Sequence, residues 1–249
     1  MRKKILGLIP TRLGSLRLPA KSLLQIGNFP LVIHVYKRAM LSKKLDDVVI
    51  CCDDKKILNA AKKFGAKAIL TSKHHLNGTE RICEAYKLLK KKYDFIVDVQ
   101  GDEPLISPHH IDEVINFHLK NLNADIILPT LKISSVNNTN IVRVLTDIKR
   151  NVLYLTRGNV PHEFKKRNKY IQKHLSIISF KPEALINFAK SKQTELEKTE
   201  DIELLRALEI GLKIKSILLK GDSFSVDMFE DYQKAKVQMK TDRFYKLYK

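Results

Sequence analysis

The sequence predicts an α/β protein with a doubly wound, mostly parallel sheet and a smaller β-rich excursion. Two patterns in its 249 residues predict this class. Short apolar runs of strand length alternate with segments of helical period through the first half, and after Val144 the rhythm becomes more strand-like. Strands buried on both faces read as continuous apolar runs, and strand-helix-strand alternation implies right-handed crossovers between parallel strands.

The first half of the chain supplies most of the expected sheet. We predict strands over residues 5–9, 48–52, 66–70, 95–99 and 126–131, and helices over 31–41, 55–64, 80–91 and 108–119. Pro30 precedes the first of these helices, Pro108 begins the last, and Gly65 ends the second, as is typical of helix boundaries. In open α/β sheets, ligands bind beyond the carboxyl ends of the strands, so the loops that follow them are candidates for function.

The second half combines strands with a long helical region. We predict strands over residues 152–156, 174–180 and 213–219, a helical region over 182–210 and a helix over 228–240. No segment has the composition of a flexible linker or a repeat. We therefore expect a single domain over residues 1–249, with the β-rich excursion around residues 145–210.

The net charge of +19 comes from 46 Lys and Arg residues against 27 Asp and Glu. A nucleic-acid-binding module concentrates such charge in one stripe with interleaved aromatic residues. Here the lysines are spread over most predicted helices, which favours solvated helix faces. We expect no nucleic-acid partner, although a basic binding module remains an alternative.

Cysteine content and hydropathy exclude several other classes. The three cysteines are an odd number, Cys51 and Cys52 are adjacent, and no metal-binding C-x-x-C or H-E-x-x-H spacing occurs. The basic start of the chain precedes an apolar run that is too short for a signal peptide, since it stops at Pro10. No stretch approaches the roughly 18 apolar residues of a membrane span. We expect a cytoplasmic protein with no membrane partner.

The segment from Ile5 to Lys21 has the pattern of a phosphate-binding loop. An apolar strand leads into a turn that contains Gly14, Ser15 and the cations Arg12, Arg17 and Lys21. Backbone N–H groups of such a loop can point at anionic oxygens, and arginine can contact two oxygens at once. The alternative is an ordinary strand-to-helix loop with solvated basic residues.

Two acidic residues follow predicted strands and are candidates for a metal site. Asp102 comes soon after the strand at 95–99, where Gly101 leaves the backbone room to turn. Mg²⁺ takes one or two protein carboxylates and fills its other positions with water and phosphate oxygens. Asp227 would complete the site, if its strand lies beside the first. The alternatives are a turn at Asp102 and a capping box of Asp227 with Glu230.

The segment Asn77–Arg81 leads into the predicted helix at 80–91. Thr79 can cap this helix, and Gly78 would let a flat nucleobase approach the backbone closely. A glycine before a helix is also ordinary turn chemistry.

Taken in order, these segments resemble the CMP-KDO synthetases, the 3-deoxy-manno-octulosonate cytidylyltransferases. The segments that carry the resemblance are Ile9–Lys21, Asn77–Arg81, Val97–Pro104, Thr156–Pro161, Lys173–Ile178, Ile202–Arg206 and Val226–Asp231. Each is weak alone, but seven collinear motifs over nearly the whole chain are difficult to obtain by chance.

The resemblance implies a nucleotide-diphospho-sugar transferase-like fold and a Mg²⁺-dependent cytidylyltransferase. Such an enzyme transfers CMP from CTP to an acidic 3-deoxy sugar, KDO or a relative such as 8-amino-KDO, and releases pyrophosphate. The product serves lipopolysaccharide synthesis. Enzymes of this family are usually homodimers, and the excursion around 145–210 would carry sugar binding and dimerisation.

The resemblance also implies roles for individual residues. Catalytic roles fall to Arg12, Lys21, Asp102 and Asp227, and the last two would hold the metal. The CTP-binding residues are Pro10, Thr11, Arg12, Arg17, Lys21, Ser72, Gly78, Thr79 and Gln100. The sugar-binding residues are Gln100, Arg157, His174 and Glu203.

The sequence departs from the family pattern at four positions. Ser72 replaces a frequent arginine, Ser176 and Ile178 replace a glycine and a tyrosine, and Leu204 replaces a glutamine. These replacements remove polar groups that would face the sugar or the base, and each lost hydrogen bond is worth about 0.5 to 1.5 kcal/mol. A site without them would hold KDO less strongly, so the acceptor could be a modified octulosonate. The departures are also compatible with a cytidylyltransferase for acylneuraminate-like acids and with a relative that has lost its activity.

Overall fold

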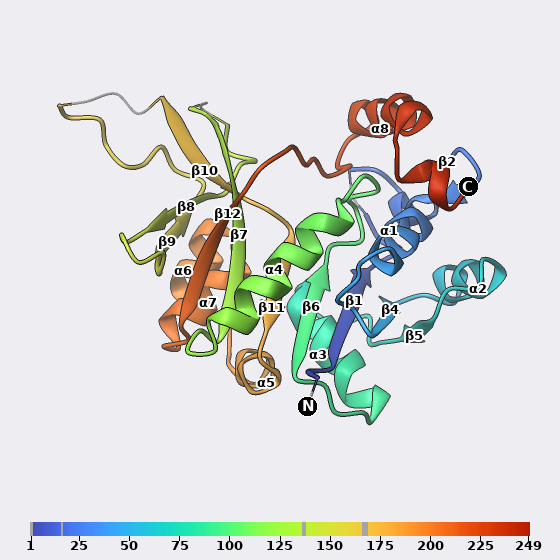
Figure 1. The fold of residues 1–249 in the computed structure, drawn as a ribbon, viewed down its shortest axis with the longest axis horizontal. Helices are drawn as coiled ribbons and strands as arrows, with labels where there is room; N and C mark the ends of the chain where they lie inside the picture. The colour runs from blue at the N-terminus through green and yellow to red at the C-terminus, as the bar shows by residue number, and fades with distance from the viewer. Residues whose placement is uncertain (1, 16, 136–137, 166–168) are drawn as a thin grey trace. The chain divides into compact units, whose positions relative to one another are not determined.

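A computed structural model describes residues 2–15, 17–135, 138–165 and 169–249. The chain forms two compact units (Figure 1). The first consists of Met1–Asp112 with Ser223–Lys249, and the second of Glu113–Asp222. The excursion that the sequence predicts around residues 145–210 falls in the second unit, and its residues 166–168 lie outside the described part of the chain.

The sheet of the first unit is entirely parallel. Its strands are β1 (Ile5–Thr11), β4 (Asp47–Cys52), β5 (Ala68–Leu70) and β6 (Phe95–Val99), in the order β5-β4-β1-β6. All seven residues of β1 are buried, as their apolar run predicts. The strand neighbours β4 and β6 both pair with β1 in parallel register.

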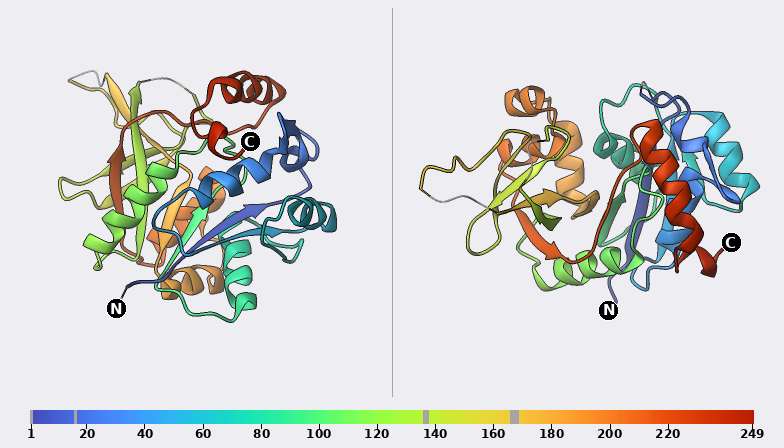
Figure 2. Two further views of the ribbon diagram at one scale, coloured as in Figure 1. Left: turned by 45° about the vertical axis from the view of Figure 1, so that its right-hand side comes forward. Right: turned by 90° about the horizontal axis from the view of Figure 1, so that it is seen from above.

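The helices between these strands cover both faces of the sheet. They are α1 (Leu31–Met40), α2 (Lys55–Lys63) and α3 (Gly78–Leu89). From β1 the chain steps to β4 and β5 in one direction and then returns past β1 to β6. Because crossovers are right-handed, this reversal places α1 and α3 on opposite faces (Figure 2). The loops after β1 and β6 therefore lie side by side at the switch point where ligands bind.

The C-terminal segment completes the first unit. Helix α8 (Phe229–Thr241) and the 3-10 turn η2 (Tyr245–Leu247) lie near the hairpin of β2 (Gln25–Ile26) and β3 (Phe29–Pro30). Tyr232 Oη donates to the Gln25 carbonyl at 2.6 Å. Another short 3-10 turn, η1 (Lys21–Leu23), follows the loop after β1. Helix α4 (Pro108–Lys120) runs through the boundary between the two units in sequence.

The sheet of the second unit is mixed and is built around β7 (Ile126–Ser134). Its other strands are β8 (Arg143–Thr146), β9 (Val152–Thr156), β10 (Tyr170–His174), β11 (Ile177–Phe180) and β12 (Ile214–Leu219). Strand β12 pairs with β7 in parallel, whereas β10 and β11 pair with it antiparallel. Strand β8 then joins β10 to β9.

Two predictions for the second unit were too coarse. The single strand predicted over 174–180 is two strands, because β10 and β11 pair with different ends of β7 and the chain must turn at Leu175 and Ser176. The helical region predicted over 182–210 is three helices, α5 (Pro182–Lys190), α6 (Glu195–Glu200) and α7 (Glu203–Glu209). A capping box begins α6, and Asp201 in the left-handed conformation ends it.

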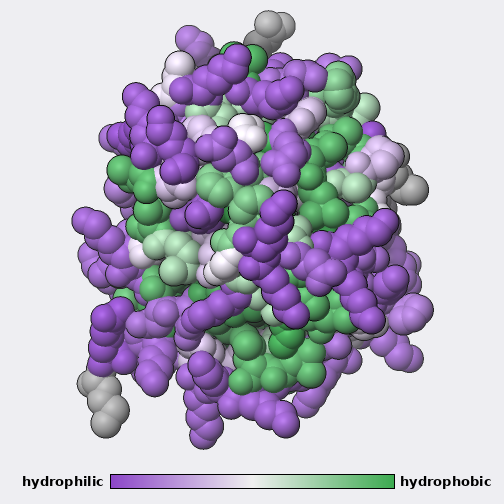
Figure 3. Space-filling view, turned by 90° about the vertical axis from the view of Figure 1, so that its right-hand side faces the viewer, coloured by the Kyte–Doolittle hydropathy of each residue, from purple (hydrophilic) through white to green (hydrophobic). Residues whose placement is uncertain are grey.

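Hydrophilic side chains are spread over the face shown in Figure 3 and are interspersed with apolar ones. This agrees with the dispersed lysines of the sequence. None of the helices among the described residues combines the length and hydrophobicity that crossing a membrane requires.

Candidate functional site

The loop after β1 presents the three predicted cations from one short segment. Arg12 and Arg17 are exposed, and Lys21 begins the 3-10 turn η1 with only 16% of its side chain exposed. The Leu13 amide donates to Asp53 Oδ1 at 2.9 Å, which fixes the start of the loop. The loop can therefore offer both flexible and anchored positive charges to an anion.

The carboxylates of Asp102 and Asp227 converge, although the reason that the sequence suggested is wrong, because β12, the strand before Asp227, pairs with β7 and not with β6. They converge on the ammonium group of Lys21, which lies 3.0 Å from Asp102 Oδ2 and 3.2 Å from Asp227 Oδ1. Arg17 Nη2 also lies 3.0 Å from Asp227 Oδ1. The Val226 amide donates to the Asp102 carbonyl at 2.9 Å, so a backbone hydrogen bond joins the two segments that carry the acids.

Asp227 does not cap helix α8, although it could by sequence. The helix begins one residue later, with Met228 as its N-cap, and the Asp231 carboxylate accepts the amides of Asp227 and Met228. The predicted pairing of Asp227 with Glu230 in a capping box is therefore wrong, because Asp231 occupies the third helical position. The Asp227 side chain is left free to face the cationic loop.

Opposing influences act on the acidity of Asp227. Burial raises the pKa of its carboxyl, but the charge and hydrogen bond of Lys21, the Ser225 hydroxyl and the charge of Arg17 outweigh burial and hold the pKa below its usual value. Asp227 is therefore ionised at neutral pH and available to a cation.

The turn that carries Asp102 requires glycine at position 101. A Cβ atom added to Gly101 would lie 2.6 Å from the Pro10 carbonyl oxygen and 3.3 Å from Thr11 Cβ. The turn after β6 thus passes directly against the end of β1. This close approach brings Asp102 to the base of the cationic loop.

Pro10, Gly78 and Gln100 lie together beside this turn. A Cβ atom on Gly78 would lie 3.3 Å from Gln100 Nε2 and 3.4 Å from Pro10 Cγ. Gln100 Nε2 donates to the buried Asp98 at 2.8 Å. The expected N-cap at Thr79 is wrong, because Asn77 caps α3 by accepting the Glu80 amide and Thr79 is buried in the first turn.

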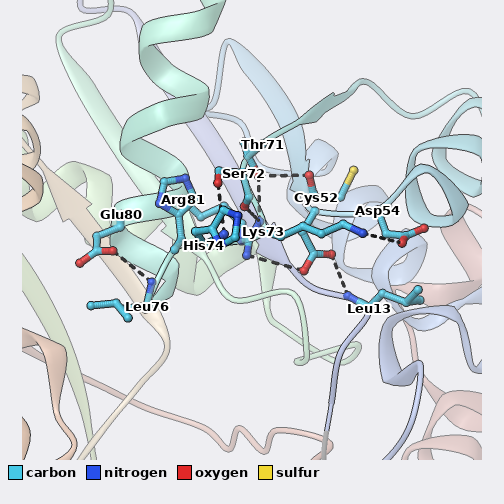
Figure 4. Close-up of polar contacts among 12 residues, drawn as sticks. Leu13, Cys52, Asp54, Thr71, Ser72, Lys73, His74, Leu76, Glu80 and Arg81 are labelled. Carbon is cyan, nitrogen blue, oxygen red and sulfur yellow. Dashed lines mark hydrogen bonds and ion pairs between the residues drawn. The ribbon is translucent and has the colours of Figure 1, made fainter.

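A buried arginine network links three loops, and the sequence analysis missed it (Figure 4). Arg81 Nη1 donates to Thr71 Oγ1 at 2.8 Å and to the Ser72 carbonyl at 3.1 Å. Arg81 Nη2 lies 3.8 Å from Asp53 Oδ2, and Asp53 accepts the Leu13 amide. Asp53 directly follows β4, so its place at the end of a strand, the same signal that marks Asp102, could have found it.

Ser72, which replaces the frequent arginine of the family pattern, is held by its backbone. Its amide donates to Glu84 Oε2 at 2.8 Å, and the same carboxylate oxygen contacts His75 Nε2. The segment that precedes Gly78 is therefore well anchored to helix α3.

The predicted sugar-binding residues Arg157, His174 and Glu203 lie in the second unit. The Arg157 guanidinium donates to three backbone carbonyls, those of Thr139, Glu200 and Asp201. Glu203 is the first residue of α7. Arg157 therefore fixes the segment that leads into Glu203.

His174 ends β10 and carries a buried polar atom. Its Nε2 atom has no hydrogen-bond partner among the described residues. Burial, together with the smaller effect of the charges of Lys173 and Arg157, lowers the pKa of His174 to about 4. The ring is therefore neutral at pH 7 and can make a hydrogen bond to a ligand.

Two of the four departures from the family pattern are buried. Ile178 in β11 and Leu204 in α7 are 2% and 1% exposed. Ser176 lies in the turn between β10 and β11 and is partly exposed.

The first unit brings two carboxylates together beside a cationic loop. Two hard carboxylate oxygens meet one cation position, which suits Mg²⁺. No cluster of three or more His, Cys, Asp or Glu side chains is placed to hold a metal within the described ranges. An ion bound by Asp102 and Asp227 would then take its remaining ligands from water and phosphate oxygens.

Known proteins are similar to this chain in sequence and fold. A family model described as cytidylyltransferase matches residues 6–214. The chain is 39% identical over 248 residues to the 3-deoxy-manno-octulosonate cytidylyltransferase of Thermodesulfovibrio yellowstonii, covering 94% of this chain and 97% of that protein. It is 34% identical over 241 residues to the 8-amino-3,8-dideoxy-manno-octulosonate cytidylyltransferase of Shewanella pealeana, covering 94% and 98%. It also matches a solved CMP:2-keto-3-deoxy-manno-octonic acid synthetase in complex with CTP, with a TM-score of 0.90 and 28% identity over 95% of this chain and 98% of that one.

Proposed function

The chain belongs to the cytidylyltransferase family, and we propose that it transfers CMP from CTP to 3-deoxy-manno-octulosonate or to its 8-amino relative. Pyrophosphate is the second product, and the CMP-sugar would enter lipopolysaccharide synthesis. The observation that carries the proposal is the meeting of Asp102, Asp227 and Lys21 beside the cationic loop. The cations of the loop complement the negative charge of a nucleoside triphosphate, and the two carboxylates complement the positive charge of its metal ion.

The cations of the loop after β1 would bind the triphosphate. In-line attack on the α-phosphorus places negative charge on its equatorial oxygens and on the departing pyrophosphate. Arg12, Arg17 and Lys21 can lie against those oxygens, and such preorganised charge accelerates phosphoryl transfer without a protein nucleophile. Pro10, Thr11, Gly78, Thr79 and Gln100 would surround the nucleoside.

Asp102 and Asp227 would hold Mg²⁺. When bound, the ion would polarise phosphate oxygens and ease loss of the proton from the attacking sugar hydroxyl. The two acids are ligands of the right kind, and the backbone bond from Val226 to Asp102 keeps them at a fixed separation. Removal of divalent ions by EDTA should therefore stop turnover, and added Mg²⁺ should restore it.

Arg157, His174 and Glu203 would bind the acidic sugar. The neutral His174 ring can accept or donate one hydrogen bond through Nε2, which supports a contact with a sugar hydroxyl. Burial of Ile178 and Leu204 supports a contribution to packing at these positions rather than lost contacts with the sugar.

Pyrophosphate release from CTP tests this function. The assay would compare 3-deoxy-manno-octulosonate, its 8-amino form and N-acetylneuraminate at equal concentration, with and without Mg²⁺. We expect turnover with one of the octulosonates and little with N-acetylneuraminate. Turnover with N-acetylneuraminate alone would reassign the acceptor, and the absence of turnover with every acid would contradict the proposal.

The homodimer and the cytoplasmic location expected from the resemblance belong to the same proposal. Exposed apolar side chains of the second unit support a dimer surface there, among them Ile148, Leu153 and Tyr170. Sedimentation equilibrium should give twice the mass of one chain. A mass of one chain at micromolar concentration would contradict the dimer.

A further inference from the structure

Lys21 occupies the position between the two carboxylates that would hold a metal ion. Its Nζ atom contacts both Asp102 and Asp227, and Arg17 makes a second contact with Asp227. Two negative charges therefore face two positive charges of the protein itself. The carboxylate pair is already compensated when no ligand is bound.

A divalent ion and the Lys21 ammonium compete for these oxygens. The two cations repel each other when both contact the same pair of carboxylates, so each weakens the binding of the other. The Lys21 side chain is mostly buried, so solvent screens this repulsion only in part. A metal ion is therefore expected to bind Asp102 and Asp227 more tightly once the ammonium has left.

The Lys21 side chain can leave without a change in the backbone. Its amide donates to the Leu18 carbonyl, and its carbonyl accepts the Leu24 amide, so the main chain is anchored in η1. The ammonium sits on four flexible methylene groups and can swing to another acceptor. A triphosphate in the loop after β1 would supply such acceptors for both Lys21 and Arg17.

The geometry points to an exchange of cations at the two carboxylates. In the nucleotide-free protein Lys21, assisted by Arg17, holds Asp102 and Asp227 and keeps divalent ions out. A bound triphosphate draws the two side chains away, and the ion then takes their place. This inference rests on the proposed function, since it requires a nucleoside triphosphate as the ligand of the loop. Nucleotide and metal would strengthen each other's binding, and that coupling is reciprocal.

The test measures Mn²⁺ binding to the full-length protein without nucleotide, by the electron paramagnetic resonance signal of free Mn²⁺. We expect Lys21→Met to bind one Mn²⁺ about 10-fold or more tightly than the unaltered protein, within the usual range of coupling between sites. Arg17→Gln should give a smaller gain. The double variant Lys21→Met with Asp102→Asn should lose the gain, because one carboxylate is then missing.

The matched control is Lys73→Met. Lys73 is an exposed lysine whose partner is Asp54, so its loss should leave Mn²⁺ binding unchanged. Equal Mn²⁺ affinity in Lys21→Met and the unaltered protein would overturn the exchange. If Lys21→Met does not fold, Lys21→Gln replaces it with the same expectation, and Arg17→Gln alone still distinguishes the outcomes, since the exchange requires it to gain affinity.

This result is separate from that of the pyrophosphate assay. Turnover of CTP by the unaltered protein with no gain in Mn²⁺ affinity in the variants would leave the proposed function intact and remove the exchange. A gain in Mn²⁺ affinity without turnover of any acidic sugar would establish the competition and contradict the proposed function.

Discussion

Arg81 donates to Thr71 Oγ1 at 2.8 Å, and through this contact a side chain of α3 binds the residue that follows β5. The same guanidinium lies 3.8 Å from Asp53, which follows β4 and accepts the amide of Leu13 in the loop after β1. One buried arginine therefore ties together the loops that leave three neighbouring parallel strands.

Loss of the Arg81 side chain should leave the loops of the proposed nucleotide site less firmly positioned. We expect Arg81→Met to lower the free energy of unfolding by about 3 kcal/mol, because it removes the charged partner of the mostly buried Asp53. The KM for CTP should rise as the loops at Leu13 and Ser72 lose their common anchor. Urea denaturation and initial rates measure the two effects.

Lys73→Met is the control for this prediction. Its ion pair with Asp54 is exposed and should contribute less than about 1 kcal/mol. A loss of stability in Arg81→Met with an unchanged KM for CTP would mean that the network supports the fold without positioning the loops.

Gly101→Ala should displace the turn that carries Asp102. Its new methyl group would lie 2.6 Å from the Pro10 carbonyl, which belongs to a buried strand and cannot move freely. We expect a loss of about 1 to 3 kcal/mol in stability, as for other overpacked sites, and a large loss of turnover. Gly14→Ala controls for stability, because no described atom lies within 4 Å of its added Cβ.

Substitutions should distinguish the proposed metal ligands, Asp102 and Asp227, from Asp231, which has a structural role at the start of α8. Asp102→Asn and Asp227→Asn should abolish turnover and leave the circular dichroism spectrum unchanged, since each removes a proposed metal ligand with little change in shape. Asp231→Ala removes the carboxylate that accepts the Met228 amide at the start of α8, and should cost about 1 kcal/mol of stability while retaining measurable turnover. Near-normal rates in either asparagine variant would assign that acid a structural role.

Two fully buried histidines should make the protein sensitive to mild acid. Burial lowers the pKa of His34 and of His118 from 6.5 to about 4, although backbone carbonyls partly oppose this shift. The unfolded state therefore binds more protons than the folded state between these values. Stability is fully present above pH 6.5 and falls as the pH drops toward 4, by on the order of 3 kcal/mol for each histidine.

Thermal denaturation across pH 4 to 7 measures this effect. His118 accepts or donates a hydrogen bond with Ser179 at 2.7 Å, and His118→Gln keeps a polar group there that cannot be protonated. The variant should show a shallower fall in melting temperature below pH 6.5. An equal slope in both proteins would show that His118 is not responsible.

Local sequence patterns predicted most of the helices and strands of the first unit, but they misidentified the residues that cap two of its helices. The apolar runs and their intervening helices predict the parallel strands β1, β4, β5 and β6 to within two residues at each end. The signal is strong for β1, β4 and β6 because nearly all of their residues are buried, whereas β5 is partly exposed. The short strands β2 and β3 of the first unit, and β8 of the second, have two to four residues and were not predicted, because so few residues show no clear hydrophobic pattern. Caps were misassigned at Thr79 and Asp227, since the N-cap residues of α3 and α8 are Asn77 and Met228, two residues and one residue away from the predicted positions.

By itself, the amino-acid order determined the alternation of strands and helices, the cationic loop after the first strand, and which acids follow strands. These are consequences of interactions between residues near one another in the chain. Only the tertiary structure decided that Asp102 and Asp227 meet at Lys21, and that Arg81 joins the loops at Leu13 and Ser72. Such partnerships join residues far apart in sequence. For Arg81 they arise because parallel crossovers bring the carboxyl ends of distant strands to one edge of the sheet, and for Asp227 because the Val226 amide binds the Asp102 carbonyl.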